Sequence, residues 1–112
     1  MANSVNILPS GGEVTGEFTP TGLTTAGLLT PVILSDAAWT ALPPSALTDR
    51  NAISIQNVSG VEIKVNYDNT EVGYVGVAVE SGAERFYNIT DSIPIYAKAA
   101  SGTPTIMIEE IS

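Results

Sequence analysis

Residues 52–67 read AISIQNVSGVEIKVNY, and this segment decides the fold class. Apolar side chains at Ile53 and Ile55 alternate with polar ones, and the alternation resumes in VEIKVNY after the break NVSG at residues 57–60. A period of two is typical of a strand that buries one face. The segment therefore predicts two strands joined by a turn at residues 57–60, which is a β-hairpin.

Other short apolar segments, each bounded by Gly, Pro, Asn or Ser, predict further strands, centred on residues 31–34, 75–79, 85–88, 93–97 and 106–109. Gly73 and Gly76, around Tyr74 and Val75, are interpreted as bulge or bend positions. Pro43 and Pro44 exclude a long helix, and no crossover helix is available to build a parallel sheet. We therefore predict an all-β chain, folded as a small antiparallel β-sandwich of jelly-roll-like type or as a small barrel.

The first 28 residues have a different texture. They are rich in Thr and Gly, carry only the charges of Glu13 and Glu17, and show no helix or strand period. We predict an extended N-terminal arm over residues 1–28 and a β-sandwich domain over residues 29–112. Apolar residues recur in the arm more often than a solvated linker needs. Those expected to anchor it on a neighbouring subunit are Val14, Phe18, Leu23 and Leu28.

Composition limits the partners. The formal net charge is −8, with 12 Asp and Glu against 4 Lys and Arg, so no basic patch is available to neutralise a nucleic-acid backbone. The sequence contains no Cys and therefore no disulfide. Neither a secretory signal nor an apolar run long enough to cross a bilayer is found, so we expect no membrane contact and a cytosolic origin.

Few residues of the chain could support catalysis or metal binding. The chain has no His and no Cys, so the usual general base, metal ligands and thiol nucleophile are absent. A Ser/Lys pair would need Lys64 or Lys98, and Lys64 is expected on the solvent side of a strand. Six glutamates are expected at turns or on polar strand faces: Glu62, Glu71, Glu80, Glu84, Glu109 and Glu110. We predict no enzymatic activity, no cofactor and no metal.

Trp39 is interpreted as a core residue or an oligomer contact. It precedes Leu42 and the proline pair, and the three together are candidates for a subunit interface. A carbohydrate platform is the weaker interpretation, because such sites present several aromatic side chains and this chain has one Trp, four Tyr and two Phe.

Residues 50–60, RNAISIQNVSG, resemble the first core hairpin of small bacteriophage virion proteins, in which an apolar strand ends in Gln-Asn before a Ser-Gly turn. Residues 82–110 are similar to the end of such proteins. The shared features are a turn glycine, an aromatic strand, an Ile-Tyr-Ala strand, a Ser-Gly-Thr turn and a final strand ending in Glu. The resemblance spans roughly residues 50–110 of the chain. The proline-rich link and the arm depart from it.

The resemblance implies a virion structural role without catalytic residues. The leading interpretation is a capsid decoration (cement) protein, assembled in the host cytoplasm and bound to the major capsid protein on the outer surface of the capsid. The alternative is a tail or fibre module that binds a receptor or glycan on the host surface. We also expect a dimer or trimer, because a small domain without disulfides has a modest core.

Overall fold

The computed structural model describes residues 25–112. This part of the chain forms eight strands and no helix, so the prediction of an all-β chain is confirmed. The strands are β1 (Gly27–Ile33), β2 (Thr40–Ala41), β3 (Ala52–Gln56), β4 (Ile63–Asn66), β5 (Val77–Val79), β6 (Glu84–Tyr87), β7 (Tyr96–Ala99) and β8 (Thr105–Ile111). Within the described range, no helix has the length and apolarity needed to cross a membrane.

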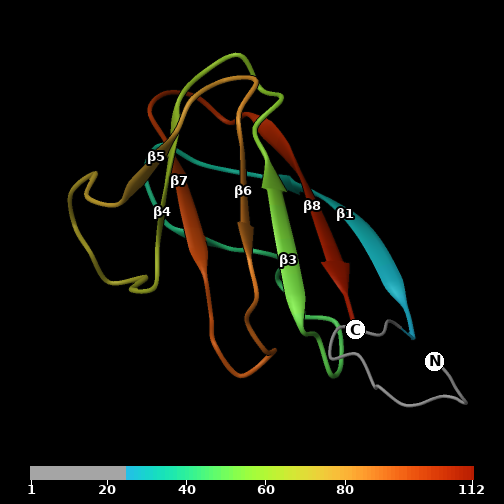
Figure 1. Cartoon of the computed structure of the whole chain (residues 1–112). Helices are drawn as coiled ribbons and strands as arrows, with labels where there is room; N and C mark the ends of the chain where they lie inside the picture. The colour runs from blue at the N-terminus through green and yellow to red at the C-terminus, as the bar shows by residue number, and fades with distance from the viewer. Residues whose placement is uncertain (1–24) are drawn as a thin grey trace, which may run out of the picture.

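The strands form two four-stranded antiparallel sheets. The first sheet has the order β1-β8-β3-β6, and the second sheet has the order β2-β7-β4-β5. Figure 1 shows the first sheet running from β1 at the right towards β6, with β7, β4 and β5 at the left. Each sheet thus combines strands from both halves of the described chain.

The pairings are nested. β1 pairs with β8, β2 with β7, β3 with β6, and β4 with β5, all antiparallel. This is the pattern of one long hairpin with its tip between β4 and β5, and the additional pairs β3·β8 and β4·β7 join its parts side by side. Strands far apart in the sequence therefore become neighbours, and β1 lies along the whole of β8.

The predicted hairpin of residues 52–67 is wrong. β3 belongs to the first sheet and β4 to the second, so residues 57–60 carry the chain from one sheet to the other. Both edges of β3 are occupied by β6 and β8, and both edges of β4 by β5 and β7. The strands were placed correctly, but each finds its partners later in the sequence.

The side chain of Asn57 stabilises the corner at residues 57–60, where the chain passes from the first sheet to the second. This side chain is buried, and Nδ2 donates to the carbonyl oxygens of Val61 and Val79, both at 2.8 Å. Its Oδ1 accepts hydrogen bonds from the backbone N–H and the hydroxyl of Ser59. The amide thus joins residues 57–61 to β5 by hydrogen bonds to backbone carbonyl groups.

Alternating side chains of both sheets form a single buried cluster. The pattern predicted for the strands is kept in three of them, in which Ile53 and Ile55, Ile63 and Val65, and Ile106 and Ile108 point inward. Burial of such side chains contributes about 1.5 to 3 kcal/mol each. The two sheets are therefore held together by one core.

β1 begins at Gly27, two residues before the predicted start of the β-sandwich domain at residue 29. Just ahead of it, the N–H of Ser112 donates to the carbonyl of Ala26 at 2.9 Å, which ties the start of the described chain to its C-terminus. The rest of the predicted arm, with Val14, Phe18 and Leu23, lies outside the described residues.

Candidate interaction surface

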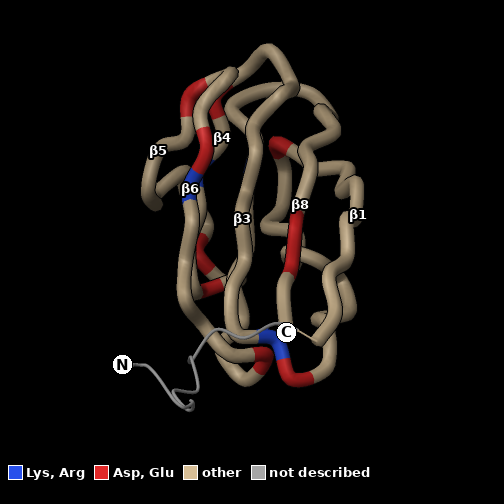
Figure 2. The backbone as a smooth tube through the Cα atoms, turned by 45° about the vertical axis from the view of Figure 1, so that its right-hand side comes forward, with Lys and Arg blue, Asp and Glu red and all other residues tan. Residues whose placement is uncertain are grey.

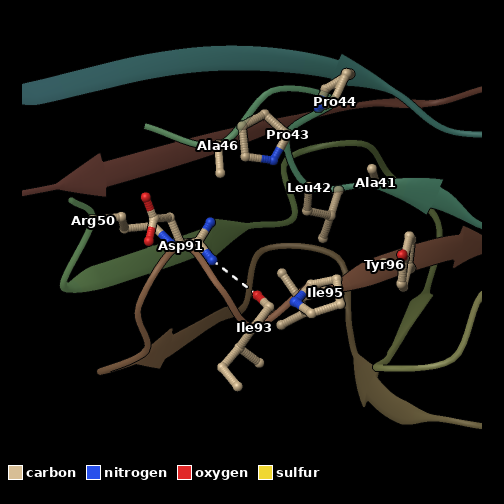
Figure 3. A pocket seen from close by; sticks show the side chains of 11 residues that line it. Ala41, Leu42, Pro43, Pro44, Ala46, Arg50, Asp91, Ile93, Ile95 and Tyr96 are labelled. Atoms are coloured by element: carbon tan, nitrogen blue, oxygen red, sulfur yellow. Dashed lines mark hydrogen bonds between the residues drawn. The ribbon is translucent and has the colours of Figure 1, made fainter. Parts of the chain in front are cut away.

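A hollow of about 200 Å³ lies beside the loop that precedes β3. Figure 3 shows its walls, which are mostly apolar and include Leu42, Pro43, Ile95 and Tyr96. The charged groups that line it are Arg50 and Asp91. Arg50 Nη2 donates to the carbonyl oxygens of Thr90 and Ile93, at 2.9 and 3.0 Å, so this part of the guanidinium is engaged by backbone.

Arg50 also forms an ion pair with Glu110 behind this wall. Nη1 lies 3.0 Å from Oε2 of Glu110, which accepts a second hydrogen bond from the N–H of Leu47. Glu110 is 0% exposed, so the expectation that it lies on a polar surface is wrong. It continues the inward series of Ile106 and Ile108, and a charge is tolerated there because a buried cation faces it. Arg50 therefore serves as a structural junction between β8 and two loops.

A second cluster of polar side chains, formed by Tyr74, Glu62 and Glu80, lies at the surface. The Tyr74 hydroxyl donates to Oε1 of Glu62 at 2.9 Å. This hydrogen bond lowers the pKa of Glu62, and the neighbouring Glu62 carboxyl raises the pKa of Glu80. Burial raises the pKa of the Tyr74 phenol. The three groups do not line the hollow, and within the described residues no cluster of three acidic side chains could hold a metal ion.

The loop between β4 and β5 covers part of the outer face of the second sheet. Trp39 Nε1 donates to the carbonyl of Glu71 at 2.8 Å, and Lys98 Nζ donates to that of Gly73 at 2.9 Å. The ammonium of Lys98 lies 5.9 Å from the centre of the Trp39 ring, and that of Lys64 lies 4.7 Å from the Tyr74 ring. Both lysines of the chain are therefore used to hold this loop on its sheet.

The outer face of the first sheet is different, because large apolar side chains stand exposed on it. Val32 of β1 points into the core, so its neighbours Pro31 and Ile33 point outward, as does Leu29. Leu29 is 62% and Ile33 is 67% exposed. At the other edge of the sheet Phe86, which lies opposite the outward Ser54, is 56% exposed.

β8 lies between these exposed groups. Its outward positions include Met107, Glu109 and Ile111, all half-buried, and the register places Met107 opposite Pro31 and Glu109 opposite Leu29. We call the following set the apolar outer face: Leu29, Pro31, Ile33, Phe86, Met107 and Ile111, with Glu84 and Glu109 among them.

The charge on this face has one sign. Glu84 accepts a hydrogen bond from the Ser54 hydroxyl, and Glu109 stands beside Leu29. On the described strands of the first sheet, no Lys or Arg occupies an outward position, because Arg85 lies opposite the inward Ile55. Figure 2 shows acidic positions along β8 and in the loops, and few basic ones. The face is therefore apolar with an anionic component.

The residues predicted to contact a partner are not brought together. Leu42 is 2% exposed and packs in the core, so it offers almost no contact surface. Trp39 is half-buried beside the second sheet, with its indole N–H engaged. Leu28 lies on β1 opposite Glu110 and is partly exposed.

Sequence reasoning missed Leu29, Ile33 and Phe86. A signal was present in residues 28–34, LLTPVIL, where both alternating sets contain apolar residues. A strand of that kind has an apolar outer face as well as an apolar inner one.

Comparison of the chain with family models, known proteins and solved structures found no match.

Proposed function

We propose that this chain is a non-enzymatic virion structural protein that binds an assembled phage capsid and stabilises it, as a decoration (cement) protein does. The observation that carries the proposal is the apolar outer face, on which Leu29, Ile33 and Phe86 expose more than half of their surface. Leu29 and Ile33 lie with Pro31 on one side of β1, and Phe86 lies at the opposite edge of the sheet, beyond the outward Ser54 and Gln56 of β3. A row of exposed apolar side chains such as that on β1 is typical of a protein-binding surface. The resemblance of residues 50–110 to small virion proteins selects the class of partner.

The strand order supports the proposal. Eight antiparallel strands in two sheets, with nested pairs from β1·β8 to β4·β5, match the arrangement of a jelly-roll sandwich, and we propose this fold for the domain. Jelly rolls are found in viral capsid domains and also in lectins. A jelly-roll fold is therefore compatible with a virion role but does not distinguish it from glycan binding.

The mechanism is thermodynamic. A protein that binds the assembled shell better than its separated subunits stabilises the shell by mass action. Many symmetry-related copies multiply a modest contact. The partners are the major capsid protein on the outer capsid surface and further copies of this chain, as a dimer or trimer. Nucleic acid and membranes do not fit a chain of net charge −8.

Co-sedimentation with expanded heads of the source phage tests the proposal. We expect the purified protein to pellet with heads, to saturate at a fixed ratio to capsid subunits, and to raise the temperature at which heads release DNA. A protein that stays in the supernatant at all concentrations, and leaves that temperature unchanged, would contradict the proposal.

One observation favours the alternative of a tail or fibre module that binds a host glycan. Tyr67 is largely exposed, and its ring meets that of Tyr87 edge to face at 6.5 Å. Such a pair can stack on a sugar ring. Binding to bacterial surface glycans on an array, lost in Tyr67→Ala, would support this alternative over the capsid role.

A further inference from the structure

We propose that the apolar outer face docks onto a protein surface whose centre is apolar and whose rim carries Lys and Arg side chains. The inference rests on the proposed function, because the capsid shell is expected to present this surface. It adds which face of the domain binds and which chemistry the partner has.

The apolar part of the face is continuous along β1. Leu29, Pro31 and Ile33 follow one another at every second position, so their side chains stand on the same side, about 7 Å apart. Met107 extends the row onto β8, because it is the register partner of Pro31. A partner needs a matching row of apolar side chains to exclude water from this strip.

The negative charge of the apolar outer face favours a basic partner over a second copy of this chain. Glu109 stands beside Leu29, and no outward cation of the described first sheet offsets it. A second copy docked by the same face would bring like charges together in a chain of net charge −8. A partner with Lys or Arg around the apolar strip would instead face carboxylates, which favours both encounter and register.

Docking by strand addition at β1 is disfavoured. Among the described strands β1 lies at the edge and pairs only with β8, and Pro31 in its middle has no N–H to donate to an added strand. The described edge of this sheet is therefore protected against backbone pairing, while its face remains apolar. This leaves side-chain contact across the face as the binding mode.

Variants at exposed or half-buried positions outside the core test the assignment. Leu29→Thr with Ile33→Thr removes apolar surface and places at both positions a β-branched residue, which suits a strand. Val72→Thr with Val75→Thr is the matched control, since Val72 is 95% exposed and both valines lie in the loop on the other sheet. Glu109→Gln removes one charge of the face. Urea unfolding checks that all three variants are folded.

Binding to heads of the source phage is measured by co-sedimentation over a range of salt concentrations. We expect the Leu29/Ile33 variant to bind at least about tenfold more weakly. Glu109→Gln should bind about threefold more weakly and lose part of the salt dependence. The control should stay within about twofold of the wild type. Equal affinity of the wild type and the Leu29/Ile33 variant would overturn the inference and leave the capsid role intact.

If the wild-type protein does not bind heads, the proposed function fails. A second measurement then tests whether the apolar outer face binds a partner of the proposed chemistry. Amide chemical shifts are followed while a synthetic amphipathic peptide of Leu and Lys is added. Shifts on β1 and β8, absent in the Leu29/Ile33 variant, support the inference. Shifts elsewhere, or none, overturn it. A concentration-dependent dimer that disappears in the Leu29/Ile33 variant would also overturn it, because the occupant would be a second copy.

Discussion

Arg50 and Glu110 form a buried ion pair, with Nη1 and Oε2 3.0 Å apart, between a loop and the last strand of the first sheet. They are 60 residues apart in the sequence, and the same guanidinium binds the carbonyl oxygens of Thr90 and Ile93. One side chain thus joins β8 to the loop before β3 and to the loop between β6 and β7. The stability of this end of the domain depends on it.

Removing both partners of the pair should destabilise the fold by less than the sum of the two single removals. Glu110→Leu leaves the Arg50 charge buried without a counter-charge, which costs about 3 to 5 kcal/mol. The double variant Arg50→Met/Glu110→Leu should lose less than the sum of the two single variants, because no uncompensated charge remains. Urea denaturation of the four proteins measures the coupling free energy. Additive losses would show that the ion pair contributes nothing beyond packing.

Asn57→Ala should lower the free energy of unfolding by about 1 to 3 kcal/mol, because the carbonyl of Val79 loses a buried donor, while that of Val61 keeps the Ser59 hydroxyl as a donor. Asn66→Ala is the control, since Asn66 Nδ2 makes the same kind of bond to the carbonyl of Val75 near the surface. Its loss should stay below about 1 kcal/mol, because water replaces the amide. Similar losses in both variants, by thermal unfolding, would argue against a special role of the corner.

Gly76→Ala should be strongly destabilising. A Cβ at position 76 would lie 2.5 Å from the carbonyl oxygen of Val65, which is backbone of β4 and cannot move aside without disturbing the sheet. Gly73→Ala is the control, because its Cβ would meet side chains alone, the flexible Glu71 carboxylate at 3.4 Å and Cγ2 of Val75 at 3.9 Å. We expect a lower melting temperature for Gly76→Ala alone. An equal change in both variants would mean that β4 and β5 can separate to make room.

Tyr74 should be the last tyrosine of the described chain to ionise, because burial and the Glu62 carboxylate raise the pKa of its phenol. A raised pKa means that the folded protein favours the neutral phenol. Its contribution to stability is therefore complete below the usual tyrosine pKa near 10 and is lost as the pH rises above that value. Ultraviolet absorbance titration should show one late step, absent in Tyr74→Phe. Four coincident steps in the folded wild type would contradict the assignment.

Much of the fold could be predicted from residues 52–67 and the similar segments around them. The alternation of Ile53 and Ile55 with polar residues marks a strand and its inner face, because side chains of a strand alternate between two sides whatever its partner is. The candidate interaction surface was harder to predict from the sequence. Leu29 and Ile33 belong to a segment that is apolar on both sides, and only the position of β1 at an edge reveals which residues stay exposed.

The sequence by itself determined most of the strands, the inward apolar residues of β3, β4 and β8, the absence of His and Cys, and the acidic charge, because these are properties of composition or of local periodicity. Only the tertiary structure decided that β3 and β4 belong to different sheets, that Asn57 shapes a corner instead of a hairpin turn, and that Glu110 is buried. Strand pairing joins residues far apart in the chain, and a local pattern carries no information on the distant partner. The burial of Glu110 depends on Arg50, whose position is set by the assembled sheets.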